Sequence, residues 1–297
     1  PFKLHLVASL LLKVGDPDHQ YPSLLVNGVD LGVWPTKEDL PGESAESDMP
    51  PPPEGRDNYP SAEQFSAEIR QTFVEEIPMG MVEGPLSEAQ AAQLCCCTPA
   101  ELCPGPLAGI DELDKIRTIY DGSWGAQNAH IQRNTAERTT APTVTDGLQA
   151  LRWLLASRGF QPATGDFVPE WRWPAPNESW SLLKADVSKA HRRIKVKAKD
   201  WKYQIAKLNG EYWVNKVGTY CMASAQLYWG RFAAALLRLM YWVFPCVDWL
   251  FVFVDDFAWL LRRTTALPLA TAILATLEAL GVPFSWKKTV LSTANIW

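Results

Sequence analysis

The sequence predicts a mixed α+β fold, in which a small antiparallel sheet carries helices on one of its faces. Three segments support this prediction. Residues 249–254 are aromatic and β-branched, as in a buried strand, and residues 205–214 resemble a hairpin that turns at Asn209-Gly210. Residues 224–241 form a long and largely apolar stretch, which favours a buried helix. Strand and helix signals therefore alternate in the second half of the chain.

Further signals place the remaining elements. Residues 1–13 have the pattern of an amphipathic helix, and residues 61–76 have helical apolar spacing with Ser61 as the N-cap. Residues 36–61 are rich in Pro, Glu, Asp, Ser and Gly, which predicts a mobile acidic linker. The other expected elements are a helix at 87–93 capped by Ser87, a strand at 115–120 that runs into an Asp121-Gly122 turn, a helix at 143–157, a strand at 181–187, and a helix at 269–280 closed by Gly281.

The charge of the chain is unevenly distributed. The formal net charge is −5, yet residues 1–114 carry 5 Lys and Arg against 20 Asp and Glu. Within residues 181–220 the balance reverses, with ten Lys and Arg against three acids. A local basic surface can neutralise phosphates even on an acidic protein, although a solvated charged face is the alternative. The cations predicted to face a nucleic-acid backbone from one extended segment are Arg192, Arg193, Lys195, Lys197 and Lys199.

Two features suggest other classes of protein and are set aside. Cys95, Cys96, Cys97 and Cys103 are poor zinc ligands, because adjacent Cys cannot all reach one tetrahedral ion without strain and no His lies nearby. We expect reduced thiols in an intracellular protein of the nucleus or the cytoplasm. Residues 232–254 are largely apolar, but charges and a proline interrupt them, which favours a buried helix and strand over a membrane span.

Three carboxylates carry the chemistry that the sequence suggests. An apolar run leads directly into Asp255 and Asp256, and Asp186 ends the strand expected at 181–187. Adjacent carboxylates at the end of a buried strand repel each other and are costly to desolvate unless a bound cation compensates. If the two strands are neighbours, the acids can hold two Mg²⁺ ions, or Mn²⁺ in their place, and such a site suits phosphoryl transfer to a hydroxyl. The alternative is a solvent-exposed turn that contains two acids.

These residues belong to a series of motifs that resembles the reverse transcriptases. Phe253-Val254-Asp255-Asp256 is similar to the aromatic-x-Asp-Asp box of that family, with Phe in the usual Tyr position. Four further segments resemble family motifs in the right order, namely 115–121 with Asn128 beyond it (the fingers strand), 184–191 (the first palm motif), 221–226 (the motif that positions template and nucleotide) and 280–289 (the fourth motif). The whole chain also resembles retroelement-derived reading frames of dinoflagellates.

The resemblance implies a fold, a reaction and a role for each matched residue. The fold would be the fingers and palm of a right-hand polymerase without its thumb. The reaction would be RNA-directed DNA synthesis, in which a dNTP is joined to a primer 3′-OH on an RNA or DNA template. Asp186, Asp255 and Asp256 would be the catalytic metal ligands with the Val187 carbonyl as a further ligand, and Lys288 would protonate the leaving pyrophosphate. The nucleotide-binding residues that it implies are Lys115, Arg117, His191 and Gln226.

The resemblance also suggests a division of the chain. An acidic N-terminal region would span residues 1–75, the fingers 76–175 and the palm 176–297. Because the chain ends just past the fourth motif, the primer grip, the thumb and any RNase H domain would lie downstream. No membrane partner is expected, and the oligomeric state is not indicated.

Two departures from the family leave other functions open. His191 stands where the family has the Phe or Tyr that excludes the ribose 2′-OH. Cys221 replaces a motif glycine, at a position where a positive φ or a close approach to the template is needed. A catalytically silent retroelement remnant that still binds nucleic acid is therefore the main alternative. An RNA-dependent RNA polymerase is a minor one, because its metal box usually has Gly before Asp-Asp.

Overall fold

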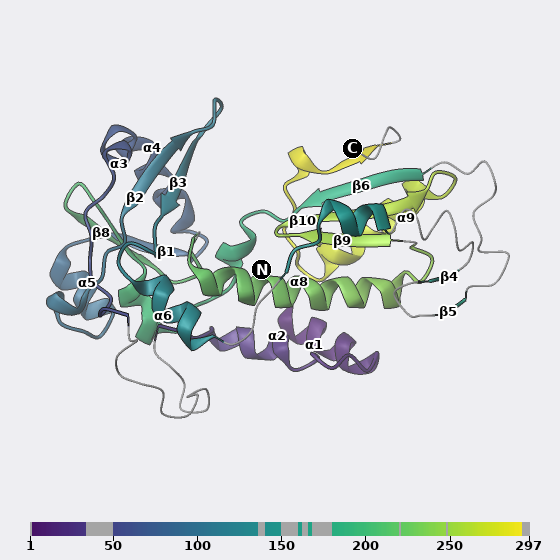
Figure 1. Cartoon of the computed structure of the whole chain (residues 1–297), viewed down its shortest axis with the longest axis horizontal. Coiled ribbons are helices and arrows are strands. Elements are labelled where there is room, and N and C mark those ends of the chain that lie inside the picture. The colour runs from purple at the N-terminus through teal and green to yellow at the C-terminus, as the bar shows by residue number, and fades with distance from the viewer. Residues whose placement is uncertain are drawn as a thin grey trace. The chain divides into compact units, whose positions relative to one another are not determined.

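The computed structural model describes residues 2–33, 50–135, 140–149, 160–161, 166–167, 180–219, 221–247 and 249–292. Its contacts divide the chain into two compact units, each assembled from segments that are far apart in the sequence (Figure 1). Unit 1 comprises Pro1–Ser23, Thr140–Ala190 and Gly230–Trp297, and unit 2 comprises Leu24–Thr139 and His191–Trp229. The division predicted from the sequence uses three consecutive ranges, whereas the chain passes repeatedly from one unit to the other.

Unit 1 is built on a four-stranded antiparallel sheet. Its strands lie in the order β11 (Val290–Ser292), β6 (Trp180–Asp186), β10 (Asp256–Arg262) and β9 (Trp249–Phe253). β6 and β9 confirm the strands expected at 181–187 and 249–254, but the sequence-based prediction omits β10. The run from Phe257 to Leu261 is apolar and has no turn residues, so its periodicity does not distinguish a strand from a buried helix.

One face of this sheet forms part of the core of unit 1. Phe257, Trp259 and Leu261 of β10 are buried, and the rings of Phe257 and Trp259 stack with their centroids 5.5 Å apart. These residues alternate with Asp256 and Ala258, because successive side chains of a strand point to opposite faces of the sheet. The same alternation that fills the core therefore turns Asp256 to the opposite face.

Two long helices accompany the sheet. α9 (Ala266–Ala279) packs against β10, and α8 (Ala223–Val243) begins in unit 2 and ends in unit 1. α9 closes as predicted, because Gly281 has a φ of +84°, a left-handed conformation that only glycine adopts without a steric penalty. Of the helix expected at 143–157, the structure describes the first part, in which residues 144–149 are helical. The predicted mixed α+β fold is confirmed.

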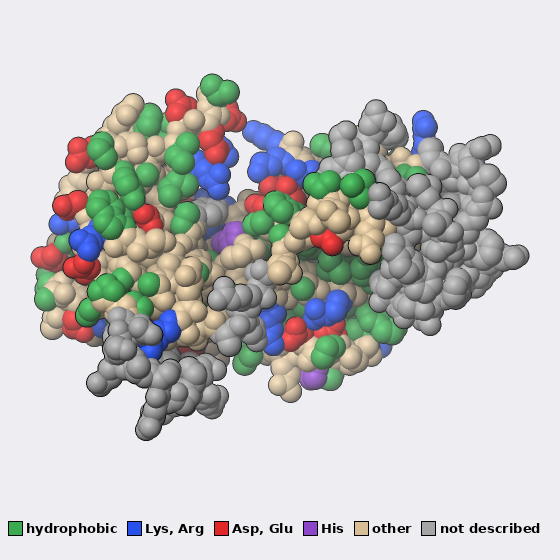
Figure 2. Space-filling view, viewed as in Figure 1, with side chains coloured by type: hydrophobic (Ala, Val, Ile, Leu, Met, Phe, Trp, Pro, Cys, Tyr) green, Lys and Arg blue, Asp and Glu red, His purple; other side chains and the backbone are tan. Residues whose placement is uncertain are grey.

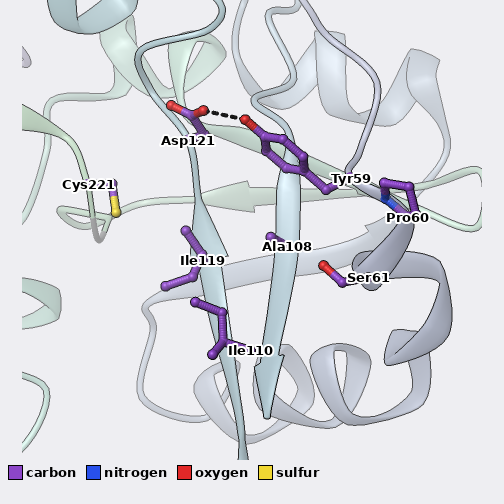
Figure 3. A pocket seen from close by; sticks show the side chains of 8 residues that line it. All are labelled: Tyr59, Pro60, Ser61, Ala108, Ile110, Ile119, Asp121 and Cys221. Atoms are coloured by element: carbon purple, nitrogen blue, oxygen red, sulfur yellow. Dashed lines mark hydrogen bonds between the residues drawn. The ribbon is translucent and has the colours of Figure 1, made fainter. Parts of the chain in front are cut away.

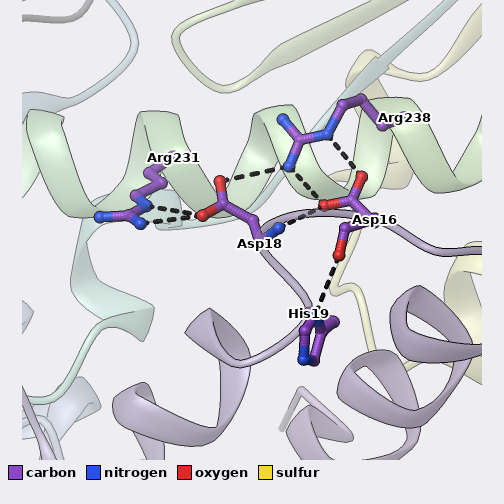
Figure 4. A network of polar contacts seen from close by, with 5 residues as sticks. All are labelled: Asp16, Asp18, His19, Arg231 and Arg238. Carbon is purple, nitrogen blue, oxygen red and sulfur yellow. Dashed lines mark hydrogen bonds and ion pairs between the residues drawn. The ribbon is translucent and has the colours of Figure 1, made fainter.

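An ion-pair network fastens the N-terminal segment of unit 1 to α8 (Figure 4). Helix α1 (Leu4–Lys13) is the amphipathic helix that the sequence predicts. Beyond it, the Asp16 carboxylate accepts hydrogen bonds from Arg238 Nε at 2.6 Å and from a terminal nitrogen of the same guanidinium at 2.9 Å. Asp18 accepts from Arg231 at 2.8 Å and from Arg238 at 3.2 Å. The Asp16 side chain is only 3% exposed. A carboxylate buried to this extent is stable in its charged form only when cations pair with it, as Arg238 does here.

Acid is expected to weaken this network. Hydrogen bonds from Arg238 lower the pKa of Asp16, and hydrogen bonds from Arg231 lower the pKa of Asp18. A carboxylate of this kind contributes stability that is complete above its unfolded pKa of about 3.9 and is lost as the pH falls through the lower folded pKa. Asp16→Asn should therefore cost about 2 kcal/mol of unfolding free energy at pH 7 and clearly less at pH 2, as measured by denaturant titration. An equal cost at both pH values would contradict this expectation.

Unit 2 contains a three-stranded sheet with the order β1 (Val82–Leu86), β8 (Glu211–Asn215), β7 (Ile205–Leu208). β7 and β8 form the hairpin that the sequence predicts. Asn209 and Gly210 have φ angles of 51° and 78°, as a two-residue hairpin turn requires. Helix α5 (Glu88–Leu94) also begins as predicted, because the Ser87 hydroxyl accepts from Gln90 N and the Gln90 side chain accepts from Ser87 N.

A second hairpin of unit 2 packs against two helices. β2 (Leu107–Asp111) pairs with β3 (Ile116–Tyr120), the strand expected at 115–120. Where one helix was expected at 61–76, α3 (Pro60–Gln64) and α4 (Ser66–Glu76) are separated at Phe65. The prediction of Ser61 as N-cap is wrong, because the Ser61 hydroxyl instead accepts from Gly109 N at 3.2 Å. A Cβ on Gly109 would lie 2.7 Å from the Phe65 side chain, so this close approach requires glycine.

The remaining elements are short. They are α2 (Tyr21–Leu24), α6 (Gln127–Asn134), β4 (Phe160–Gln161), β5 (Asp166–Phe167) and 3-10 turns at Leu25–Asn27, Pro99–Glu101, Ala190–Arg193, Ala198–Tyr203 and Trp286–Lys288. Most of the linker expected at 36–61 lies outside the described residues. Within the described part of the chain, no helix is long and apolar enough to cross a bilayer. On the face that Figure 2 draws, acidic side chains are scattered among basic and apolar ones over the region of α3, α4 and α5.

Candidate active site

The three predicted carboxylates lie at one end of the sheet in unit 1. The antiparallel register of β6 and β10 places Asp186 directly opposite Asp256. Asp255 belongs to the two-residue turn between β9 and β10, and its carbonyl oxygen accepts a hydrogen bond from Val187 N at 2.8 Å. The prediction requires that the strands bearing the acids be neighbours. The two strands predicted to carry the acids, β6 and β9, are not neighbours, because β10 lies between them. Asp186 and Asp256 meet because Asp256 begins β10, which pairs with β6.

Two lysines pair with acids at this end of the sheet. Lys288 Nζ donates to Asp186 Oδ2 at 2.9 Å, and the Asp186 side chain is only 8% exposed. Lys184 of β6 pairs through Nζ with Asp256 Oδ2 at 3.0 Å. The hydrogen bond to Asp186 raises the pKa of Lys288, and the charges of Asp255 and Asp256 raise it further. All three carboxylates therefore act on the ammonium group that the sequence identifies as a candidate proton donor.

The oxygen atoms at this site are of the kind that a hard divalent cation such as Mg²⁺ binds. Carboxylate and backbone carbonyl oxygens are the ligands that Mg²⁺ prefers. Asp256 Oδ1 is a buried oxygen with no hydrogen-bond partner, a costly situation that a bound cation would relieve. Among the described residues, no group of three or more His, Cys, Asp and Glu side chains is arranged to hold a metal ion, and Lys184 and Lys288 each occupy one oxygen of a carboxylate.

The predicted triphosphate-binding cations share one acidic partner in unit 2. Lys115 lies just before β3 and Arg117 lies within it. Lys115 Nζ is 3.4 Å from Glu112 Oε2, and Arg117 Nη1 is 3.3 Å from Glu112 Oε1. The Lys115 and Arg117 side chains are 59% and 55% exposed, so an anion in solution can reach both of them. Desolvation acts to raise the pKa of Glu112, but the hydrogen bonds and charges of Arg117 and Lys115 together outweigh it and lower that pKa.

The two other predicted nucleotide-binding residues contact each other in unit 2. His191 lies in the 3-10 turn at Ala190–Arg193, and Gln226 lies in the first turn of α8. His191 Nε2 and Gln226 Oε1 are 2.6 Å apart, so the ring nitrogen donates to the amide oxygen when it carries the proton. The structure therefore brings together two residues that the motif comparison assigns to the same pocket.

Asn128 fixes the turn that contains Cys221, a role that the sequence does not reveal. Asn128 Nδ2 donates to the Cys221 carbonyl oxygen at 2.7 Å, and Asn128 Oδ1 accepts from Ala223 N, the first residue of α8, at 2.9 Å. Cys221 has a φ of +67°. The prediction that this position needs a positive φ is confirmed, and a side chain stands where glycine would be unstrained.

Cys221→Gly is expected to stabilise the protein by about 1 kcal/mol, because the left-handed conformation strains a residue that has a Cβ. The unfolding free energy would be measured by denaturant titration. Cys246→Gly is a matched control, since Cys246 is also an exposed free cysteine but is not among the residues with positive φ. A similar change in both variants would show that Cys221 is not strained.

A groove of about 480 Å³ on unit 2 was not predicted (Figure 3). Its polar feature is a hydrogen bond from the Tyr59 hydroxyl to Asp121 Oδ2 at 2.7 Å, which raises the pKa of Tyr59. The ring of Trp124 lies 5.3 Å from that of Tyr59. The residues that line the groove are Tyr59, Pro60, Ser61, Ala108, Ile110, Ile119, Asp121 and Cys221. In the sequence, Asp121 belongs to a turn signal and to the segment that resembles the fingers strand, and neither pattern indicates a groove.

The predicted nucleic-acid-facing segment is only partly available for that role. Residues 190–193 form a 3-10 turn and not an extended strand. Arg192 is buried and pairs with Glu76. Lys197 and Lys199 both pair with Asp30, at 2.7 and 2.6 Å. The prediction that Arg192 faces a nucleic-acid backbone is wrong, because its side chain is only 4% exposed and pairs with a buried carboxylate. The Lys197 and Lys199 side chains are 43% and 64% exposed, so for them it stays a prediction. Lys195 is exposed.

The fold is similar to that of two solved reverse transcriptase structures. The foamy viral protease-reverse transcriptase in complex with double-stranded DNA has a TM-score of 0.52 and 13% identity to this chain, over 87% of this chain and 44% of the viral one. The foamy viral protease-reverse transcriptase dRH, also with double-stranded DNA, gives 0.51 and 14%, over 85% and 36%. This chain therefore spans less than half of either viral chain. No family model matches the sequence, and no curated protein matches it.

Proposed function

We propose that this chain is the polymerase portion of a reverse transcriptase encoded by a retroelement. It would join dNTPs to a primer 3′-OH, directed by an RNA or DNA template, inside the cell in the nucleus or the cytoplasm. The observation that carries the proposal is the cross-strand pairing of Asp186 with Asp256, with Asp255 in the adjoining turn, in a fold shared with reverse transcriptases.

The three aspartates are the proposed ligands of two Mg²⁺ ions, which Mn²⁺ can replace, with the Val187 carbonyl as a further ligand. When bound, the ions would stabilise the negative charge that develops on the transferring phosphoryl group. The chain's own contribution is the placement of the acids. Strand pairing fixes Asp186 opposite Asp256, and the hydrogen bond from Val187 N fixes the backbone of Asp255.

The cations and polar side chains are proposed to act on the nucleotide. The raised pKa of Lys288 keeps its amine protonated, as a donor to the leaving pyrophosphate must be. Lys115 and Arg117 would bind the triphosphate, for which the planar fork of Arg is well suited. His191 and Gln226 would contact the nucleotide as a hydrogen-bonded pair.

The proposal is tested by primer extension with this chain, an RNA template, a DNA primer and Mg²⁺. We expect incorporation of dNTPs, its loss when a chelator removes the metal, and its loss in the Asp255→Asn, Asp256→Asn double variant. Parallel reactions with NTPs separate a reverse transcriptase from an RNA-dependent RNA polymerase. Incorporation that persists in the double variant would mean that Asp255 and Asp256 are not part of the polymerase site.

A catalytically silent remnant is the second candidate, and one observation favours it. Cys221 places a side chain at a strained position where the family motif has glycine. If the folded chain binds a template-primer but incorporates neither dNTPs nor NTPs, the remnant is the correct description and the proposed activity is wrong. Retained binding would be measured by fluorescence anisotropy at several salt concentrations.

A further inference from the structure

Lys184 is placed by β6 on the same face as the catalytic candidate Asp186. The two residues are two positions apart, and side chains at that spacing point to the same side of a strand. In the register with β10, Lys184 lies opposite Ala258, and Asp186 lies opposite Asp256. Lys184 is therefore the diagonal neighbour of Asp256, a position that a long side chain can span. The 3.0 Å between Lys184 Nζ and Asp256 Oδ2 shows that it does.

Two of the three carboxylates each form an ion pair with a different lysine. Lys288 holds Asp186, and Lys184 holds Asp256. Lys184 is 49% exposed and Asp256 is 29% exposed, so their ion pair can open to solvent without unfolding the sheet. The other oxygen of Asp256, Oδ1, is buried and has no hydrogen-bond partner. Asp256 thus offers one oxygen bound to a lysine and one oxygen that is unsatisfied.

We infer that Lys184 is a positioning residue that competes with a divalent cation for Asp256 and thereby sets the cation affinity of the carboxylate cluster. The inference rests on the proposed function, in which these carboxylates bind Mg²⁺. In the absence of the cation, the ammonium group offsets the repulsion between Asp186, Asp255 and Asp256. A cation that binds at Asp256 must work against the same ammonium charge, so Lys184 weakens its binding.

The expected change in cation affinity follows from the short distance between the Lys184 ammonium group and a cation bound at Asp256. Two like charges about 4 Å apart repel strongly at the effective dielectric constant of a protein surface and weakly in bulk water. Lys184 is about half exposed, which places the pair between these limits. Removal of its charge should therefore tighten cation binding by about tenfold.

The experiment measures Mn²⁺ binding to the 297-residue chain and its variants, with free Mn²⁺ quantified by electron paramagnetic resonance. Lys184→Met should lower the dissociation constant by about tenfold, and Lys184→Arg, which keeps the charge, should leave it close to that of the unmodified chain. Lys13→Met is the matched control, because it removes the same charge from α1, outside the sheet, and should change the constant less than twofold.

A double-mutant cycle assigns the effect to the ion pair. In an Asp256→Asn background, Lys184→Met should give no gain in affinity, since the carboxylate for which the two cations compete is gone. Stabilisation of the folded state by Mn²⁺ in thermal unfolding should follow the same order of variants. Tight binding by the unmodified chain with no gain in Lys184→Met would overturn the inference and leave the proposed metal site intact. Failure of every variant to bind Mn²⁺ would overturn both.

Discussion

Asp186→Asn is expected to lower the rate of dNTP incorporation by about 10³-fold or more, the scale seen when a charged group that stabilises a transition state is removed. Asp186 is the most buried of the three acids. Its side chain is 8% exposed, pairs with Lys288 and lies opposite Asp256. Asn preserves the size of the side chain but removes its charge, so the fold should persist. Single-turnover primer extension with saturating template-primer isolates the chemical step from binding.

The control for this variant is Asp57→Asn, which removes the same charge from an exposed position before α3. It should extend the primer at the rate of the unmodified chain. Unfolding curves for both variants show whether either change damages the fold. If Asp186→Asn remains folded and incorporates dNTPs at an unchanged rate, Asp186 is not part of the polymerase site.

The proximity of Asp186, Asp255 and Asp256 could be predicted, because each of them follows a local apolar pattern in the sequence. Apolar strands that end at Asp186 and before Asp255 are visible in the sequence, and the resemblance implies that their acids share one site. The identity of the neighbouring strand could not be predicted. β10 lies between β6 and β9, so Asp256 begins a strand of its own. The Lys184–Asp256 ion pair follows from that register, which is a property of the folded sheet and not of any short segment.

The basic segment at residues 181–220 shows why the charges in a sequence do not identify the groups with which they pair. Ten Lys and Arg within residues 181–220 suggest a surface for phosphates. Arg192, however, pairs with Glu76, which is 116 residues away in the sequence, and Lys197 pairs with Asp30, 167 residues away. The acidic excess of the N-terminal residues therefore supplies partners for cations that follow in the chain. Such long-range pairing leaves no periodic signal.

Glu76→Gln is expected to cost about 3–5 kcal/mol of unfolding free energy, the largest stability loss that we predict. The Glu76 and Arg192 side chains are each only 4% exposed. Arg192 also donates to Asn215 Oδ1 at 2.7 Å and to the Gly218 carbonyl oxygen at 3.4 Å. These neutral acceptors cannot balance its charge, so the loss of Glu76 leaves a buried and uncompensated cation. Denaturant titration measures the cost.

An exposed ion pair in the same unit provides the matched control. Arg70 and Glu211 lie 3.2 Å apart with side chains 46% and 38% exposed. Glu211→Gln should cost less than about 1 kcal/mol, because solvent screens the pair. If Glu76→Gln costs no more unfolding free energy than Glu211→Gln, burial does not increase the contribution of the Glu76–Arg192 pair to stability.

Variants of the Glu76–Arg192 ion pair distinguish a structural role of Arg192 from a contact with nucleic acid. If burial decides its role, Glu76→Leu combined with Arg192→Met should recover much of the stability that either single change loses, since the double variant leaves no charge unpaired. The double variant should also keep the salt dependence of template-primer binding, because Arg192 neutralises no phosphate. A slope of log K against log salt that falls by about one would mean instead that Arg192 leaves Glu76 to contact the nucleic acid.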